Sequence, residues 1–162
     1  ANPFSPSLEG PTEQMLSAMA PYAGFGQRLA LANLWLTGPL VRRTLEGSPM
    51  GAALLRTTIA PTMLDAGIKD NVLPPEAEAI VNFRIRPGET LETVTARVVR
   101  IIADTMISVA PMDSATADPS QVSDTSSPEY QRLVALIRQM FPGEQVPVLP
   151  YLVMGGTDAK YW

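Results

Sequence analysis

Two arginines near the middle of the chain could bind an anion. Arg84 and Arg86 lie two positions apart in residues 79–86, where apolar and polar side chains alternate. Such alternation is typical of a β-strand, which would place both guanidinium groups on one face. A guanidinium group can bind a carboxylate through two parallel hydrogen bonds. From the spacing alone, a solvated face of a half-buried sheet explains the pair at least as well.

Two turn segments are further candidates for contact with a ligand. Asn71 stands in a turn before two prolines, where its side chain can reach a ligand or simply bind its own backbone. Near the end of the chain, Gly155-Gly156-Thr157-Asp158 could present successive N–H groups to an anion. The same four residues could instead form a turn into a helix, with Thr157 or Asp158 as the N-cap. Both readings stay open for each turn.

The composition excludes several kinds of site. The 162 residues include no His and no Cys, so this chain has no disulfide, no Ser–His or Cys–His catalysis and no imidazole metal ligand. The carboxylates show no metal-ligand spacing, so no metal ligands are assigned here. The formal net charge of −4 argues against a nucleic-acid partner. The apolar stretch at residues 29–36 is much shorter than the about 20 residues that span a bilayer, and a buried helix is expected there.

The first part of the chain is predicted to be helical. Proline and glycine divide it into short pieces, for which helices are expected at residues 12–19, 27–36 and 39–45. Thr12 is the expected N-cap of the first helix. Pro39 is expected in the first turn of the third, where its missing N–H costs nothing.

The middle of the chain is predicted to hold the sheet. Strands are expected at residues 54–64, 79–86 and 106–110. Pro61 places an edge, a bulge or a bend in the first strand. A helix at 91–101, capped by Thr90, is expected between the second and third strands. This order predicts an α+β fold, a ferredoxin-like two-layer sandwich that still needs one strand and one helix more.

The last part changes to an α/β pattern. Residues 113–127 are rich in Ser, Thr, Asp and Pro and are expected to be a linker. Ser127 and Pro128 then open a helix to about residue 141, and a strand is expected at 146–154. The predicted organisation is therefore 1–112, a linker at 113–127, and part of a second domain at 128–162. We expect the sequence to be a fragment of a longer protein.

Taken together, the motifs resemble the zinc-dependent peptidase and aminoacylase family. The likeness is to the carboxypeptidase S or Gly-Xaa carboxypeptidase branch, which includes N-fatty-acyl-amino-acid hydrolases. It covers nearly the whole chain, and the order of the motifs makes it far more specific than any one of them. The motifs that carry it are Arg56-Thr57-Thr58-Ile59-Ala60-Pro61-Thr62, Lys69-Asp70-Asn71-Val72-Leu73-Pro74-Pro75, Val81-Asn82-Phe83-Arg84-Ile85-Arg86-Pro87-Gly88 and Gly155-Gly156-Thr157-Asp158-Ala159.

The resemblance implies a two-zinc hydrolase of amide bonds. Its substrate would be a dipeptide or an N-acyl amino acid with a free carboxylate. Residues 1–112 would be most of a ferredoxin-like lid that also forms a homodimer. The zinc ligands and the general base would lie outside this chain.

By the same resemblance, four residues of this chain would contact the substrate. Arg84 would bind the substrate carboxylate, Asn71 would reach the site from the lid, and Gly156 and Thr157 would contact the carboxylate from the catalytic domain. A second interpretation, from another class of function, is a non-catalytic dimerisation or binding module.

Overall fold

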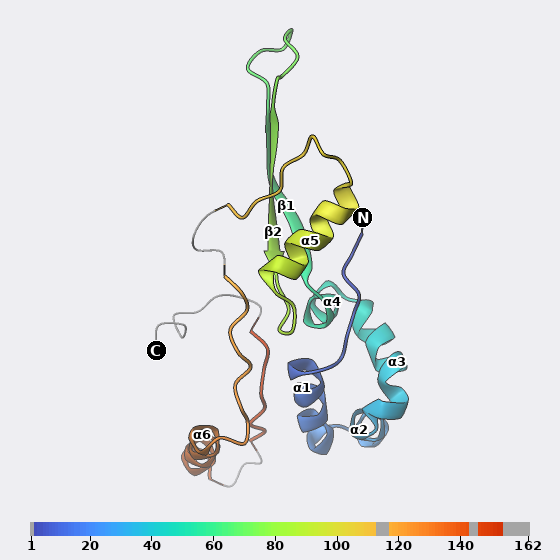
Figure 1. Ribbon diagram of the computed structural model, residues 1–162. Helices are drawn as coiled ribbons and strands as arrows, with labels where there is room; N and C mark the ends of the chain where they lie inside the picture. Colours follow the sequence, from blue (N-terminus) through green and yellow to red (C-terminus); the bar gives the residue numbers. More distant parts are fainter. Residues whose placement is uncertain (1, 113–116, 143–145, 154–162) are drawn as a thin grey trace. The chain divides into compact units, whose positions relative to one another are not determined.

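A computed structural model describes residues 2–112, 117–142 and 146–153 of the chain (Figure 1). These residues form helices and a two-stranded antiparallel sheet, so the predicted α+β class is confirmed. The chain divides into two compact units. One consists of Ala1–Ser5 and Arg56–Pro119, and the other of Pro6–Leu55 and Ser120–Trp162. The division at 113–127 remains a prediction.

The first unit is built on a long β-hairpin. Strands β1 (Thr58–Ala66) and β2 (Ala77–Arg84) pair antiparallel, with Thr58 opposite Arg84 and Ala66 opposite Ala77. The register shifts between Pro61 and Met63, where β1 carries one extra residue. A bulge suits this place because proline has no N–H to give to the ladder. The expected irregularity at Pro61 is confirmed.

Helix α5 (Leu91–Ile102) lies across one face of this hairpin (Figure 1). The Thr90 hydroxyl accepts a hydrogen bond from the Thr93 N–H at 3.2 Å, and the Thr93 hydroxyl accepts one from the Thr90 N–H at 2.9 Å. This reciprocal pair satisfies two N–H groups that a helix start leaves without partners. The predicted cap and helix are both confirmed.

The second unit is helical. Its elements are α1 (Pro11–Met19), the 3₁₀ turn η1 (Ala20–Tyr22), α2 (Phe25–Ala32), α3 (Leu34–Glu46), α4 (Pro49–Leu55) and α6 (Pro128–Met140). Its core consists of Met15, Leu16 and Leu54, against which Leu8, Leu31, Leu34, Val41, Leu45 and Leu152 pack. The Ser127 hydroxyl caps α6 by accepting from the Tyr130 N–H, with Pro128 in first position, as predicted.

Three predictions about the first helices are wrong. Thr12 is not a cap but a buried residue within α1, whose hydroxyl donates to the Leu54 carbonyl at 2.7 Å. The break between the second and third helices lies at Asn33, whose side-chain amide donates to the Leu29 carbonyl. Pro39 lies inside α3, beyond its first turn. Tertiary packing therefore overrides the local signal of proline here.

The predicted strands also need correction. Residues 54 and 55 end α4, and the first strand begins only at Thr58. Residues 106–110 form no strand, because Asp104 holds a turn there: its carboxylate accepts from the Met106 N–H and its carbonyl from the Ile107 N–H. Residues 146–153 form no strand either, and Met154 lies outside the described residues.

Candidate functional site

Arg84 ends β2 and is exposed. Phe83 and Val81, its odd-numbered neighbours, face α5 together with Ile59. Because successive side chains in a strand point to opposite faces, Arg84 projects from the face that α5 leaves open. The predicted alternation is confirmed, and Arg84 itself is exposed.

A buried hydroxyl fixes the backbone directly after Arg84. Thr57 is 1% exposed, and its hydroxyl accepts a hydrogen bond from the Arg86 N–H at 2.8 Å. The same hydroxyl donates to the Glu89 carboxylate. The Glu89 N–H returns to the Arg86 carbonyl at 3.0 Å and closes the turn. These bonds orient the end of β2, and no role for Thr57 was assigned from the sequence.

Arg86 differs from Arg84 in its surroundings. The strand ends at Arg84, two residues earlier than predicted, so Arg86 lies outside it. Arg86 is partly buried, whereas Arg84 is exposed. The two guanidinium groups are therefore not equivalent members of one strand face, and Arg84 is the better placed of the two for a ligand.

Asn71 lies in the exposed loop that joins β1 to β2. Seven residue steps separate Ala77, where β2 begins, from Arg84, which at about 3.3 Å per residue is more than about 20 Å. Asn71 lies beyond Ala77 along the loop, so the hairpin places the two candidates at opposite ends. Gly156 and Thr157 lie outside the described residues.

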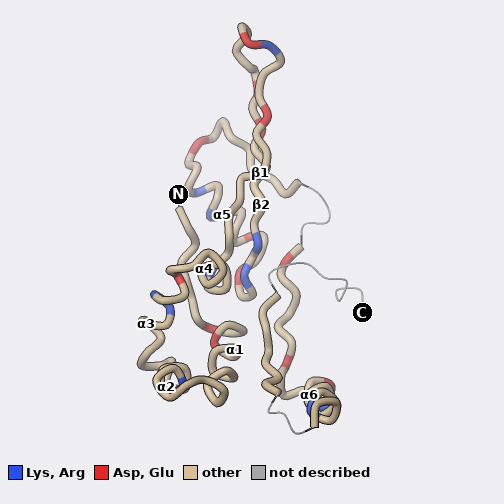
Figure 2. Tube along the Cα trace, turned by 180° about the vertical axis from the view of Figure 1, so that it is seen from behind, with Lys and Arg blue, Asp and Glu red and all other residues tan. Residues whose placement is uncertain are grey.

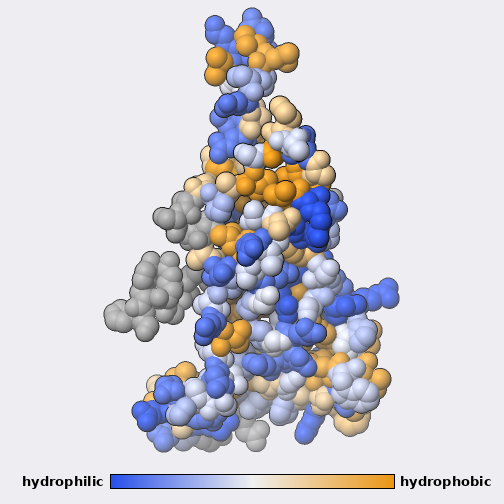
Figure 3. Space-filling view, viewed as in Figure 1, coloured by the Kyte–Doolittle hydropathy of each residue, from blue (hydrophilic) through white to orange (hydrophobic). Residues whose placement is uncertain are grey.

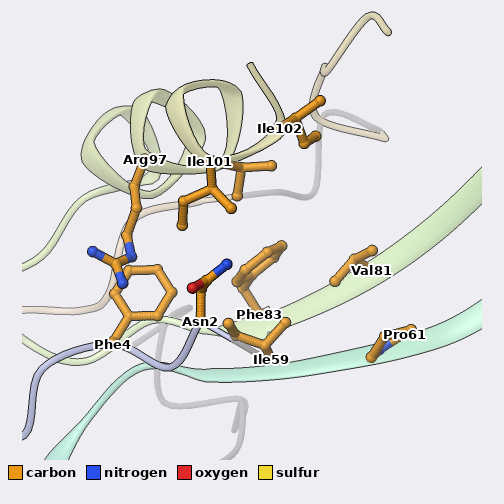
Figure 4. A pocket seen from close by; sticks show the side chains of 10 residues that line it. Asn2, Phe4, Ile59, Pro61, Val81, Phe83, Arg97, Ile101 and Ile102 are labelled. Carbon is orange, nitrogen blue, oxygen red and sulfur yellow. The ribbon is translucent and has the colours of Figure 1, made fainter. Parts of the chain in front are cut away.

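An apolar pocket lies between α5 and the hairpin (Figure 4). Its volume is about 240 Å³, and its walls include Ile59, Val81 and Phe83 from the sheet and Ile101 from α5. Phe4 closes one side, with its ring edge-on to Phe83 at a centroid distance of 6.4 Å. Neither Arg84 nor Asn71 lines this pocket.

Arg97 fastens the start of the chain to α5. Its guanidinium carbon lies 4.7 Å from the centre of the Phe4 ring, and one guanidinium nitrogen donates to the Pro3 carbonyl at 2.9 Å. A cation over an aromatic face is attractive because of the ring quadrupole. Arg97 therefore has a structural role, because it holds residues 3 and 4 against α5.

The described residues offer no metal site. They contain no group of three or more His, Cys, Asp or Glu side chains close enough to hold an ion. The donor set of this part of the chain therefore does not fit the two zinc ions that the resemblance implies.

The pKa of Asp124 lies below its usual value because the Ser126 hydroxyl and N–H donate to its carboxylate. That pair belongs to the helical unit, whereas both described candidates belong to the hairpin unit.

Comparison with known proteins identifies the hairpin and the first helices as a known kind of domain. Residues 11–109, more than half of the chain, match the peptidase dimerisation domain. The chain is 37% identical over 153 residues to the mouse N-fatty-acyl-amino acid synthase/hydrolase PM20D1. The aligned region covers 94% of this chain and 30% of the relative. It is 36% identical over 162 residues to the probable carboxypeptidase S-like 2 of Dictyostelium discoideum, covering 99% of this chain and 30% of the relative. No solved structure matches the chain.

These relatives agree with the branch that the motifs indicated. An N-fatty-acyl-amino acid synthase/hydrolase and a carboxypeptidase S-like protein are the kinds of protein that the sequence resembles, and the chain spans about 30% of the length of each. The dimerisation-domain match includes Asn71 and Arg84 and ends before the predicted linker. The chain therefore belongs to the peptidase dimerisation domain family.

Proposed function

We propose that the intact protein hydrolyses an amide bond in a dipeptide or an N-acyl amino acid, and that this segment binds the free carboxylate of the substrate. The observation that carries the proposal is Arg84, exposed at the end of β2 on the face that α5 leaves open. An exposed guanidinium group can meet a carboxylate through two charge-assisted hydrogen bonds. The names of the relatives, an N-fatty-acyl-amino acid synthase/hydrolase and a probable carboxypeptidase, support this class of substrate.

The metal chemistry belongs to polypeptide outside this chain. We propose that the intact protein uses two zinc ions, and that none of their ligands is among these 162 residues, which include no His and no Cys. The segment instead contributes binding and orientation. Fixing a substrate relative to the reacting groups lowers the activation barrier. The translational and rotational entropy is lost when the substrate binds, so it need not be lost in the chemical step.

A homodimer would bring the separated candidates to one substrate. Asn71 and Arg84 lie at opposite ends of one hairpin, so we propose that Asn71 of one subunit approaches Arg84 of the other. In the two-stranded sheet of the described residues, each strand has one edge without a paired neighbour. Such edges readily pair with another strand. Gly156 and Thr157 remain proposed contacts from the catalytic domain.

The substrate test compares two ligands that differ in one charge. An N-acyl amino acid and its carboxamide are offered to the intact protein, and kcat/KM is measured for both. We expect the carboxamide to be poorer by about tenfold or more, because it cannot accept two charge-assisted hydrogen bonds from a guanidinium group. Equal values would contradict carboxylate binding.

The dimer test measures mass in solution. Sedimentation equilibrium of the intact protein is expected to give twice the mass of one chain at micromolar concentration. A monomer at every concentration would overturn the dimer proposal. A dimer that hydrolyses neither dipeptides nor N-acyl amino acids would favour the second candidate, a non-catalytic dimerisation module, for which the family match itself speaks.

A further inference from the structure

Helices α2 and α3 expose large apolar side chains. They are Phe25, Leu29, Trp35, Leu36 and Leu40, which we call the α2–α3 surface. Phe25 is 87% and Trp35 82% exposed, so neither contributes to the core of the helical unit. The expectation of a buried helix at residues 29–36 is therefore wrong for Leu29, Trp35 and Leu36. Figure 3 shows hydrophobic side chains gathered over this helix pair. Single exposed apolar residues are ordinary, but a group of this size indicates a contact with something else.

The first two turns of α3 are apolar on every side. Residues 34–41 include no charge, and Thr37 is their single hydroxyl residue. That hydroxyl is already used, because it donates to the Ala30 carbonyl at 2.6 Å. Leu34 and Val41 pack on the core, while Trp35 and Leu40 point elsewhere. A helix that is apolar all round is normally covered all round.

The charge on the same helices is mainly basic, since three arginines stand against one acid, Glu46, the last residue of α3. No Asp or Glu occurs between Gln14 and Leu45, although the chain as a whole carries a net charge of −4. The segment holds Arg28 on α2 and Arg42 and Arg43 on α3, all exposed. Figure 2 shows these two helices carrying basic residues. Arginine beside exposed Trp, Phe and Leu is the composition of helices that lie in the interface of a membrane.

We propose that the α2–α3 surface docks on a phospholipid surface that contains anionic head groups. The apolar side chains would enter the boundary between head groups and acyl chains, where Trp is favoured. The arginines would bind phosphate and carboxylate groups of the lipids.

The lengths of the helices require them to lie parallel to the plane of the membrane. The 13 residues of α3 extend about 20 Å, less than the about 30 Å hydrocarbon core. None of the described helices is long and apolar enough to cross a bilayer. The helix pair would therefore lie on the lipid surface and not pass through it. This docking does not depend on Arg84 or on hydrolysis, so it goes beyond the proposed function.

The experiment is co-sedimentation of the intact protein with lipid vesicles. One set consists of phosphatidylcholine alone and the other of phosphatidylcholine mixed with phosphatidylserine. We expect binding to the mixed vesicles that weakens with added salt. The double variant Phe25→Ser/Trp35→Ser is expected to bind about tenfold more weakly or worse. The triple variant Arg28→Gln/Arg42→Gln/Arg43→Gln should lose the preference for the mixed vesicles.

A matched control removes an exposed apolar side chain elsewhere. Met106 is 90% exposed and belongs to the hairpin unit, so Met106→Ser should bind vesicles as the unchanged protein does. The fluorescence of Trp35 gives a second measurement. In a Trp162→Phe background, Trp35 is the one tryptophan of this segment, and mixed vesicles should shift its emission to the blue.

This measurement uses the isolated segment only if circular dichroism shows that the segment is folded. Otherwise, the difference in emission between the intact protein and its Trp35→Phe variant is measured instead.

Three outcomes would overturn the proposal. The first is that the intact protein binds neither kind of vesicle. The second is that Phe25→Ser/Trp35→Ser binds as well as the Met106→Ser control. The third is that the double variant changes the sedimentation mass and not the vesicle binding, which would assign the surface to a second copy. Hydrolysis is measured separately, so failure of the docking leaves the proposed function untouched.

Discussion

Replacing Arg84 by Ala is expected to lower kcat/KM for an N-acyl amino acid by about 30- to 150-fold, equivalent to about 2–3 kcal/mol. The reason is the loss of a charge-assisted contact to the substrate carboxylate. Arg84→Lys should recover only part of the activity, because an ammonium group keeps the charge but not the planar pair of donors. The measurement is steady-state kinetics of the intact protein.

Two controls separate binding from folding. Arg100, exposed in the last turn of α5, offers a matched Arg→Ala change, which should leave kcat/KM unchanged. The carboxamide substrate offers the other, since Arg84→Ala should hydrolyse the acid and the carboxamide at similar rates. If Arg84→Ala kept the full preference for the acid, Arg84 would not be the carboxylate ligand.

Replacing Gly51 by Ala is expected to destabilise the connection between α3 and α4 by about 3 kcal/mol or more, the upper end for overpacking. Gly51 is buried in α4, and its N–H donates to the Ser48 hydroxyl at 3.1 Å. A Cβ there would lie well inside van der Waals contact with the Leu45 carbonyl oxygen and 2.9 Å from the carbonyl carbon. Backbone atoms cannot rotate away, so α4 itself would have to move.

Hydrogen exchange measures this effect locally. In Gly51→Ala, the amides of α4 should exchange about 100-fold faster than in the unchanged protein. Gly26→Ala in α2 is the matched control, because its Cβ would meet nothing within 4 Å and Ala favours a helix by about 1 kcal/mol. Equal exchange in the two variants would contradict the packing argument.

The sequence predicted those parts of the fold that depend on local signals. The alternation in β2, the cap at Thr90 and the Ser127-Pro128 start of α6 all act within a few residues of themselves. The predictions that failed depend on distant partners. Residues 106–110 are apolar enough for a strand, but no neighbouring strand of the described residues pairs with them. Pro39 stays within α3 because Leu34, Val41 and Leu45 hold both sides of it on the core.

The candidate site was predictable by residue but not by arrangement. The exposure of Arg84 follows from the alternation of its strand. The bonding of Thr57 to Arg86 and Glu89 joins residues about 30 positions apart, which no local pattern reveals. The separation of Asn71 from Arg84 follows from the register of the hairpin, and a bulge alters that register. The pairing of residues that are distant in the sequence is therefore the part of the site that could not be predicted.

The extra residue beside Pro61 also divides the hairpin into two mechanical parts. Before it, Ile59 and Phe83 line the pocket beside α5, so that half of the hairpin is supported by packing. Beyond the extra residue, Asp65 stands opposite Glu78. Two carboxylates directly opposite each other destabilise the pairing of the strands. We expect the half of the hairpin beyond the extra residue to be the more mobile, with the largest displacements in the loop that contains Asn71.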